Sequence, residues 1–185
     1  MKTVDEAKLV ALVTQGDSFA FAELTQRHLP AIESYARRIL SDEMAAQDIA
    51  QDTLLVLWQR SADFNPKKAK LTTWLHRVAH NRCIDLLRRQ KRETPMASDD
   101  LFDRQEVNQM ATSIDSPDTA KGSSTSMDLA LRALPESQRT ALVLTYYQNL
   151  SNREVADVMN ASTRAVESLL CRARGNLKKQ LENQQ

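Results

Sequence analysis

The chain has 185 residues, of which 42% are hydrophobic and 26% charged, and its formal net charge is only +1. This composition is that of a folded soluble protein, and the scarcity of glycine and aromatic residues argues against a β-rich fold. No apolar run approaches the roughly 18 residues of a membrane span, and the first ten residues lack the layout of a signal peptide. Cys83 and Cys171 lie far apart inside helical patterns, which fits reduced thiols better than a disulfide framework. We therefore expect an all-α cytoplasmic protein without membrane insertion.

Periodicity predicts helices throughout the first half of the chain. Between residues 21 and 39, apolar side chains recur every three or four positions, and Pro30 is expected to kink or split this stretch. A second helix is predicted over residues 44–60 and a third over residues 71–92. The loop between them contains Asn65-Pro66, a sequence that breaks helices.

The small net charge conceals strong local imbalances. Residues 64–92 carry nine basic side chains and one acidic, a net charge of +8. Residues 1–63 have a net charge of −4, residues 93–126 of −5, and residues 127–185 of +2. A basic band of this density needs a polyanion nearby or a strong tolerance of self-repulsion. The charge pattern therefore favours a nucleic-acid partner.

The stretch 93–126 lacks sustained periodicity and is acidic and rich in serine, threonine and proline. Such a composition is typical of a flexible linker. A structureless stretch of this length is unusual inside one compact domain. We therefore expect two helical domains, residues 1–92 and 127–185, joined by a flexible acidic linker.

The second domain contains a predicted helix-turn-helix at about residues 151–175. Pro135 suits the first turn of a preceding helix that runs to Tyr147. Ser151 and Glu154 fit a capping box at the start of a short helix, and Asn160 suits the left-handed backbone at its end. A longer basic helix is predicted to follow, over residues 163–181. This order matches a DNA-binding motif whose second helix enters the major groove.

Five apolar side chains of that last helix are expected to pack inward, namely Val166, Leu169, Leu170, Ala173 and Leu177. The polar side chains on its other side become candidates to contact bases or phosphates of duplex DNA. Arginine can bind guanine through two hydrogen bonds, and glutamate can accept one from cytosine. The alternative is a plain helical hairpin with a solvated charged face. The candidates are Arg164, Glu167, Ser168, Cys171, Arg172 and Arg174.

The basic helix at residues 70–92 has one narrow polar face at 100° per residue. Cations beside an exposed aromatic ring suit a nucleic-acid backbone together with an unstacked base. The alternative is a solvated face with Trp74 inside the core. The face consists of Lys70, Trp74, Arg77, Asn81 and Arg88, and the preceding loop adds Phe64, Asn65, Lys67 and Lys68.

Three segments, in this order and spacing, resemble the extracytoplasmic-function (ECF) group of the sigma-70 family. They are DIAQDTLLVLWQR, DFNPKKAKLTTWLHRVAHNRCIDLLRR and LPESQRTALVLTYYQNLSNREVADVMNASTRAVESLLCRAR. The resemblance covers nearly the whole chain apart from the linker and the last few residues. Several motifs in register are more specific than one helix-turn-helix, which many unrelated repressors share.

The resemblance implies a sigma factor that directs RNA polymerase core to promoters. The first domain resembles region 2: the helix at 45–60 docks on the β′ clamp helices, and the loop and helix at 63–89 read the −10 element as a melted single strand. The second domain resembles region 4, which reads the −35 element as duplex and contacts the β flap. An anti-sigma partner is also implied. The residues that match the core-polymerase-binding motif are Asp48, Gln51, Asp52 and Leu55.

Other kinds of site find little support in the sequence. His76, His80 and Cys83 have a spacing that could hold a metal, but a fourth ligand is not evident. With three glycines the chain lacks a phosphate-binding loop, so we expect no cofactor, metal or catalytic residue. The rival functions are a freestanding helix-turn-helix transcription regulator and an adaptor that sequesters a partner. Neither rival needs the basic aromatic helix at residues 70–92.

Overall fold

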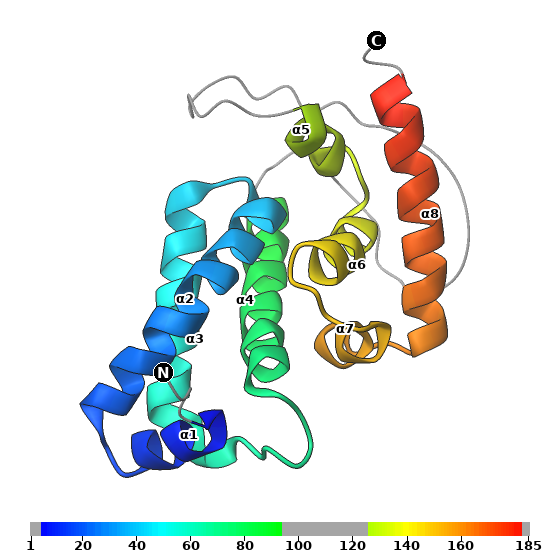
Figure 1. The fold of residues 1–185 in the computed structure, drawn as a ribbon. Helices are drawn as coiled ribbons and strands as arrows, with labels where there is room; N and C mark the ends of the chain where they lie inside the picture. The colour runs from blue at the N-terminus through cyan, green and yellow to red at the C-terminus, as the bar shows by residue number, and fades with distance from the viewer. Residues whose placement is uncertain (1–4, 94–125, 183–185) are drawn as a thin grey trace.

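A computed structural model describes residues 5–93 and 126–182 (Figure 1). Over these two ranges the chain forms eight α-helices and one 3₁₀ turn, without a strand, which confirms the predicted all-α class. The predicted linker falls almost entirely outside the described residues. Among the described helices, none combines the length and the apolar character needed to cross a membrane.

The N-terminal half contains four helices: α1 (Glu6–Thr14), α2 (Ser18–Leu40), α3 (Glu43–Arg60) and α4 (Leu71–Glu93). Aspartates cap the first three, because the side chains of Asp5, Asp17 and Asp42 each accept a hydrogen bond from a backbone N–H of the first turn. Each cap satisfies a donor that the helix itself cannot pair, which stabilises the start of the helix by about 1 kcal/mol. The starts of these three helices are therefore determined by residues close to them in the sequence.

Helix α2 runs unbroken through Pro30, so of the two outcomes predicted for this proline, a kink or a split, the split is excluded. A proline inside a helix costs about 3 kcal/mol because one backbone hydrogen bond is lost. Here the proline ring is exposed, while Leu24 and Ile32 on either side of it are fully buried. Burial of the continuous apolar face on both sides of Pro30 offsets the loss.

The N-terminal core lies where α4 packs on α2 and α3. Leu71, Leu75, Ala79 and Cys83 form a stripe on α4 that is almost fully buried. Burial raises the pKa of the Cys83 thiol to about 12, so this sulfur stays protonated and unreactive at neutral pH. The stripe determines which side of α4 faces water.

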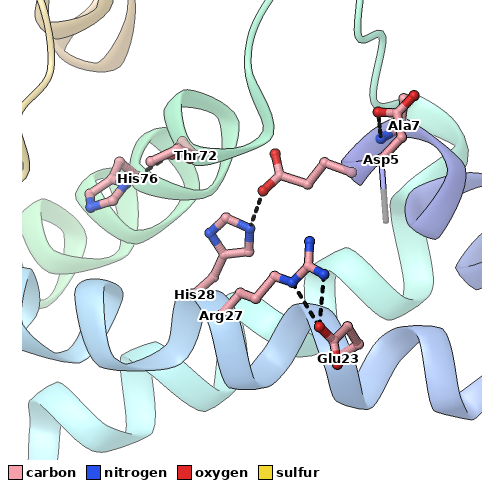
Figure 2. Close-up of polar contacts among 8 residues, drawn as sticks. Asp5, Ala7, Glu23, Arg27, His28, Thr72 and His76 are labelled. Carbon is pink, nitrogen blue, oxygen red and sulfur yellow. Dashed lines mark hydrogen bonds and ion pairs between the residues drawn. The ribbon is translucent and has the colours of Figure 1, made fainter. Parts of the chain in front are cut away.

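Helix α1 is held on α2 by a pair of polar side chains (Figure 2). His28 Nε2 lies 3.0 Å from Glu6 Oε1, and the histidine ring is buried. Further along, the Thr14 hydroxyl donates to Val10 O and lies 3.1 Å from the Ser61 hydroxyl. These contacts fasten the N-terminal helix over the end of α3.

The C-terminal half also contains four helices: α5 (Ser126–Arg132), α6 (Glu136–Tyr146), α7 (Asn152–Met159) and α8 (Thr163–Glu182). Pro135 caps α6 from one position before it, rather than lying in its first turn as predicted. The predicted capping box is confirmed: Glu154 Oε2 accepts from the Ser151 N–H at 2.8 Å, and the Ser151 hydroxyl accepts from the Glu154 N–H. Asn160 has φ 51°, the left-handed conformation expected at the end of α7.

The two halves lie against each other, an arrangement that the sequence left open. Helix α7 packs on α4, and α5 and α6 pack on α2 (Figure 1). Polar groups line this contact: His76 Nε2 lies 3.2 Å from Gln148 Oε1, and His76 Nδ1 lies 2.8 Å from Thr72 O. Among the described residues, no cluster of histidine, cysteine or carboxylate side chains could hold a metal.

The buried histidines make stability sensitive to acid. Burial, with a smaller contribution from Arg88, lowers the pKa of His80 from 6.5 to about 4. Its Nδ1 lies 2.9 Å from the Tyr35 hydroxyl, whose own pKa burial raises well above 10, so a neutral imidazole can accept this proton. Burial also lowers the pKa of His76.

We expect the free energy of unfolding to fall as pH decreases from about 6.5 to about 4. In this window the unfolded chain binds a proton at His80 that the folded protein excludes, which amounts to about 2–3 kcal/mol. Urea unfolding at a series of pH values measures the slope. His80→Gln, which retains an acceptor for Tyr35, should flatten the slope, and an unchanged slope would contradict the assignment.

Candidate nucleic-acid interfaces

One side of α4 presents cations to solvent. Lys70, Arg77, Asn81 and Arg88 are all exposed, and Trp74 lies among them half-buried. We call these five residues the α4 face. The buried stripe on the opposite side excludes the cations from the core, so their positions agree with the predicted polar face. The structure therefore brings together the helical part of the predicted −10 site.

The loop before α4 is shaped by Asn65. Its side-chain Oδ1 accepts from the Lys67 N–H at 2.9 Å, and its carbonyl accepts from the N–H of Lys68 at 3.0 Å. This turn leaves both lysine side chains exposed beside the start of α4. Asn65 was predicted from the sequence as a DNA contact. In the structure it stabilises the loop through these two hydrogen bonds.

The sequence left two alternatives for Trp74, a ring exposed on the polar face or a ring inside the core, and the structure has features of both. Its ring packs against the hydrophobic core and meets Phe64 edge-on, with centroids 6.2 Å apart. The side chain is nevertheless only partly buried. Phe64 and Trp74 therefore form a small aromatic platform at the N-terminal end of the α4 face, and such platforms accept unstacked bases.

Lys70 has a partner that sequence reasoning missed. Its Nζ lies 3.0 Å from Glu154 Oε1 on α7, although 77% of the lysine side chain remains exposed. The two residues are 84 positions apart in the chain, so no local pattern could have revealed the contact.

The second candidate interface is α8. Val166, Leu170 and Ala173 are buried, whereas Leu169 and Leu177 are only partly buried, so the predicted inner side is largely confirmed. Every predicted contact residue on the outer side is exposed, namely Arg164, Glu167, Ser168, Cys171, Arg172 and Arg174.

Two arginines flank this outer side of α8. The Arg174 guanidinium lies 5.8 Å from the centroid of the Tyr146 ring on α6, and the Arg172 Nε–H donates to Ser168 O at 3.4 Å. At 100° per residue the two side chains leave the helix about 160° apart. Charges so placed can contact phosphates on either side of a groove, while the residues between them face its floor.

Helix α3 has an exposed stripe that mixes acidic and apolar residues. Asp48, Gln51, Asp52 and Leu55 are all exposed. Asp52 is already paired inside the domain, because its Oδ2 lies 2.8 Å from Arg82 Nη1. Asp48 is in no ion pair among the described residues, so an external partner can bind this carboxylate without breaking one.

Two apolar residues extend the α3 stripe beyond the predicted set. Met44 is 78% exposed and Trp58 is 37% exposed. Both continue the spacing of three and four that joins Asp48, Gln51 and Leu55, so they lie on the same side of the helix. This spacing was present in the sequence, but only the exposure distinguishes an outward stripe from a core-facing one.

Comparison with known proteins identifies the family to which both halves of the chain belong. Residues 24–93 match sigma-70 region 2, and residues 124–177 match sigma-70 region 4. The chain is 33% identical to the RNA polymerase sigma factor NccH of Alcaligenes xylosoxydans xylosoxydans over 189 residues, covering 99% of this chain and 97% of that protein. It is 30% identical to the ECF RNA polymerase sigma factor SigM of Mycobacterium tuberculosis, covering 93% of this chain and 82% of that protein.

The fold is also found in a solved structure, that of the sigma factor RpoE in complex with the anti-sigma factor NepR from Bartonella quintana. The TM-score is 0.68 at 25% sequence identity, and the match covers 88% of this chain and 96% of that one. Two helical halves with these matches, in this order, define a transcription initiation factor of the sigma-70 type. More narrowly, the chain belongs to the extracytoplasmic-function group of the sigma-70 family.

Proposed function

We propose that this alternative sigma factor binds RNA polymerase core through α3, reads the −10 element as a single strand with the α4 face, and reads the −35 element as duplex with α8. The observation that carries the proposal is the α4 face, where exposed cations adjoin the Phe64–Trp74 platform. A freestanding helix-turn-helix regulator has no use for such a surface. In this division the N-terminal helices act as region 2 and the C-terminal helices as region 4.

Strand capture needs binding rather than catalysis. Unstacking a base costs a few kcal/mol per step, and stacking on an aromatic ring returns about 1–3 kcal/mol. Lys67, Lys68 and Arg77 add attraction to the phosphates, which is independent of sequence and sensitive to salt. The polymerase supplies the chemistry, so this chain needs no catalytic residue or cofactor and acts in the cytoplasm.

The exposed α3 stripe suits a helical partner surface. Leu55 and Trp58 offer apolar contact area, and Asp48 offers a charge for a basic residue. In our proposal these residues dock on the clamp helices of the β′ subunit, while the C-terminal half contacts the β flap. The Bartonella quintana relative was solved with an anti-sigma factor. We propose a partner of the same kind for this chain.

Run-off transcription with purified core polymerase tests the function directly. Promoters can be taken from genes whose transcripts rise when the protein is overexpressed. We expect specific transcripts only when this protein and core are both present. Tight binding of duplex DNA without core, together with no core-dependent transcript, would instead establish a freestanding regulator.

We expect the triple charge reversal Lys67→Glu, Lys68→Glu and Arg77→Glu to impair promoter opening. Removing three phosphate contacts should lower strand affinity at least tenfold at moderate salt and reduce its salt dependence. Permanganate footprinting of the −10 region and a core-binding titration measure the two steps separately.

The matched control reverses three exposed cations away from the interface, Lys8, Arg37 and Lys179. It changes the net charge equally and should leave promoter opening intact. Equal losses of opening and core binding in the test variant would refute the assignment of these residues to the −10 strand.

Replacing Arg172 by alanine should weaken initiation that depends on the −35 element. A phosphate or base contact of this kind is worth about 1–3 kcal/mol, which corresponds to roughly a 5- to 150-fold loss in occupancy. DNase footprinting of the −35 region with the holoenzyme measures it. Lys179→Ala, two turns further along α8, serves as the control, and an unchanged footprint for Arg172→Ala would contradict the placement of the recognition surface.

A further inference from the structure

Helix α1 lies before the part of the chain that matches sigma-70 region 2, which begins at residue 24. It nevertheless belongs to the core of the N-terminal half, because Leu9, Val10 and Val13 on one of its sides are buried. The helix packs on α2, on α3 and on the 3₁₀ turn η1 (Ser61–Asp63), beside the segment that leads from α3 into α4 (Figure 1). Helix α1 therefore borders the loop at residues 64–70, which we call the strand loop.

A pair of hydroxyl groups joins α1 to η1. The Thr14 hydroxyl donates to Val10 O at 3.0 Å and lies 3.1 Å from the Ser61 hydroxyl, 47 positions away in the chain. Because the single proton of Thr14 is used within α1, its oxygen can accept a hydrogen bond from Ser61. Ser61 is 5% exposed, so little water reaches its side of the contact. One directed hydrogen bond thus holds the last turn of α1 against the first residue of η1.

The same serine continues into the strand loop. Its carbonyl accepts from the Phe64 N–H at 3.2 Å, which closes η1 and fixes the direction in which the chain leaves α3. An Arg60–Asp63 ion pair also spans this turn, but both side chains are largely exposed, so solvent weakens it. The hydrogen bonds therefore form a route from Thr14 through Ser61 to Phe64, the first ring of the aromatic platform.

The other end of α1 is fastened close to α4. Glu6 Oε1 lies 3.0 Å from His28 Nε2 on α2 (Figure 2). His28 is in turn a neighbour of His76 on α4: burial lowers the pKa of His76, and the charge of His28 adds to this effect. Helix α1 therefore has one attachment at the start of the strand loop and another near the helix that follows the loop.

We propose that α1 holds the strand loop in place, and that Thr14 and Ser61 are positioning residues for the −10 strand that act through Phe64. The proposal rests on the function proposed above, in which a base of the strand stacks on Phe64 and Trp74. A loop that moves freely must be ordered when the strand binds, and the lost conformational entropy reduces affinity. A loop ordered beforehand by α1 avoids this cost.

Amide hydrogen exchange of the full free chain, followed by nuclear magnetic resonance, tests the support without DNA. Thr14 is exposed, so Thr14→Val replaces its hydroxyl by a methyl group of similar size without disturbing the core. We expect the Phe64 amide to exchange about 2- to 10-fold faster, the range for loss of one hydrogen bond. Thr14→Ser retains the hydroxyl and should exchange like the wild type.

The effect on DNA is measured with each variant assembled on core polymerase. A fluorescent single-stranded oligonucleotide that carries the −10 element of a responsive promoter reports strand affinity through its anisotropy. Thr14→Val and Ser61→Ala should each lower this affinity about 2- to 10-fold, while a core-binding titration stays unchanged. The double variant should lose no more than the weaker-binding single variant, because both changes remove the same bond.

Thr53→Val is the matched control. The Thr53 hydroxyl donates to Ile49 O, four residues earlier, as the Thr14 hydroxyl does to Val10 O, but Thr53 lies two turns before η1. The control should leave both Phe64 exchange and strand affinity unchanged.

Three results would overturn the role of α1: unchanged Phe64 exchange in Thr14→Val, faster exchange without weaker strand binding, or equal losses in Thr53→Val. The proposed function fails in a different way, when the wild-type holoenzyme itself does not bind the strand. Strand binding by the wild type that Thr14→Val leaves unchanged refutes the role of α1 alone.

Discussion

The structure depends on the burial of one stripe of α4 against α2 and α3. Leu71, Leu75, Ala79 and Cys83 leave almost no surface exposed, and this orientation turns the cations of the same helix toward solvent. The stretch 64–92 has a net charge of +8, which opposes compaction through self-repulsion. Hydrophobic burial overcomes the repulsion, at about 25 cal/mol per Å² of apolar surface removed from water. A concentrated cationic surface on a rigid helix is the result.

Helix α4 also carries two histidines away from its exposed face, the buried His76 and the partly buried His80. Both remain neutral because burial disfavours their charged forms. Buried polar groups of this kind need partners, and Gln148 and Tyr35 provide them. The His76–Gln148 bond crosses the contact between the halves, whereas His80 and Tyr35 pair within the N-terminal half. A contact built of polar groups is also easier to dissolve than an apolar core, because water can replace the lost partners.

In the proposed function, two weak DNA-reading surfaces on one chain suit a protein that works together with RNA polymerase. Tethering both readers to polymerase raises their effective concentration at the promoter, so neither must bind tightly alone. In the proposed function the exposed faces of α3, α4 and α8 bind different partners. Within the free chain, the ion pairs Asp52–Arg82 and Lys70–Glu154 already occupy some of the charges on these faces. Partner binding then exchanges one ion pair for another, which lowers the cost of leaving a charge desolvated and unpaired.

Local patterns were enough to predict helices α2, α3, α4, α6, α7 and α8, the capping box of Ser151 and Glu154, the turn at Asn160 and the polar faces of α4 and α8, because all of these arise from interactions within a few residues. The same patterns did not single out α1 and α5. The family also followed from motifs that are local and in order. Tertiary packing was needed to establish that α2 continues through Pro30, that Trp74 is half-buried on Phe64, and that Glu154 reaches Lys70. Each of these depends on groups brought together from distant parts of the chain, where burial outweighs local preference and no periodic pattern records the partner.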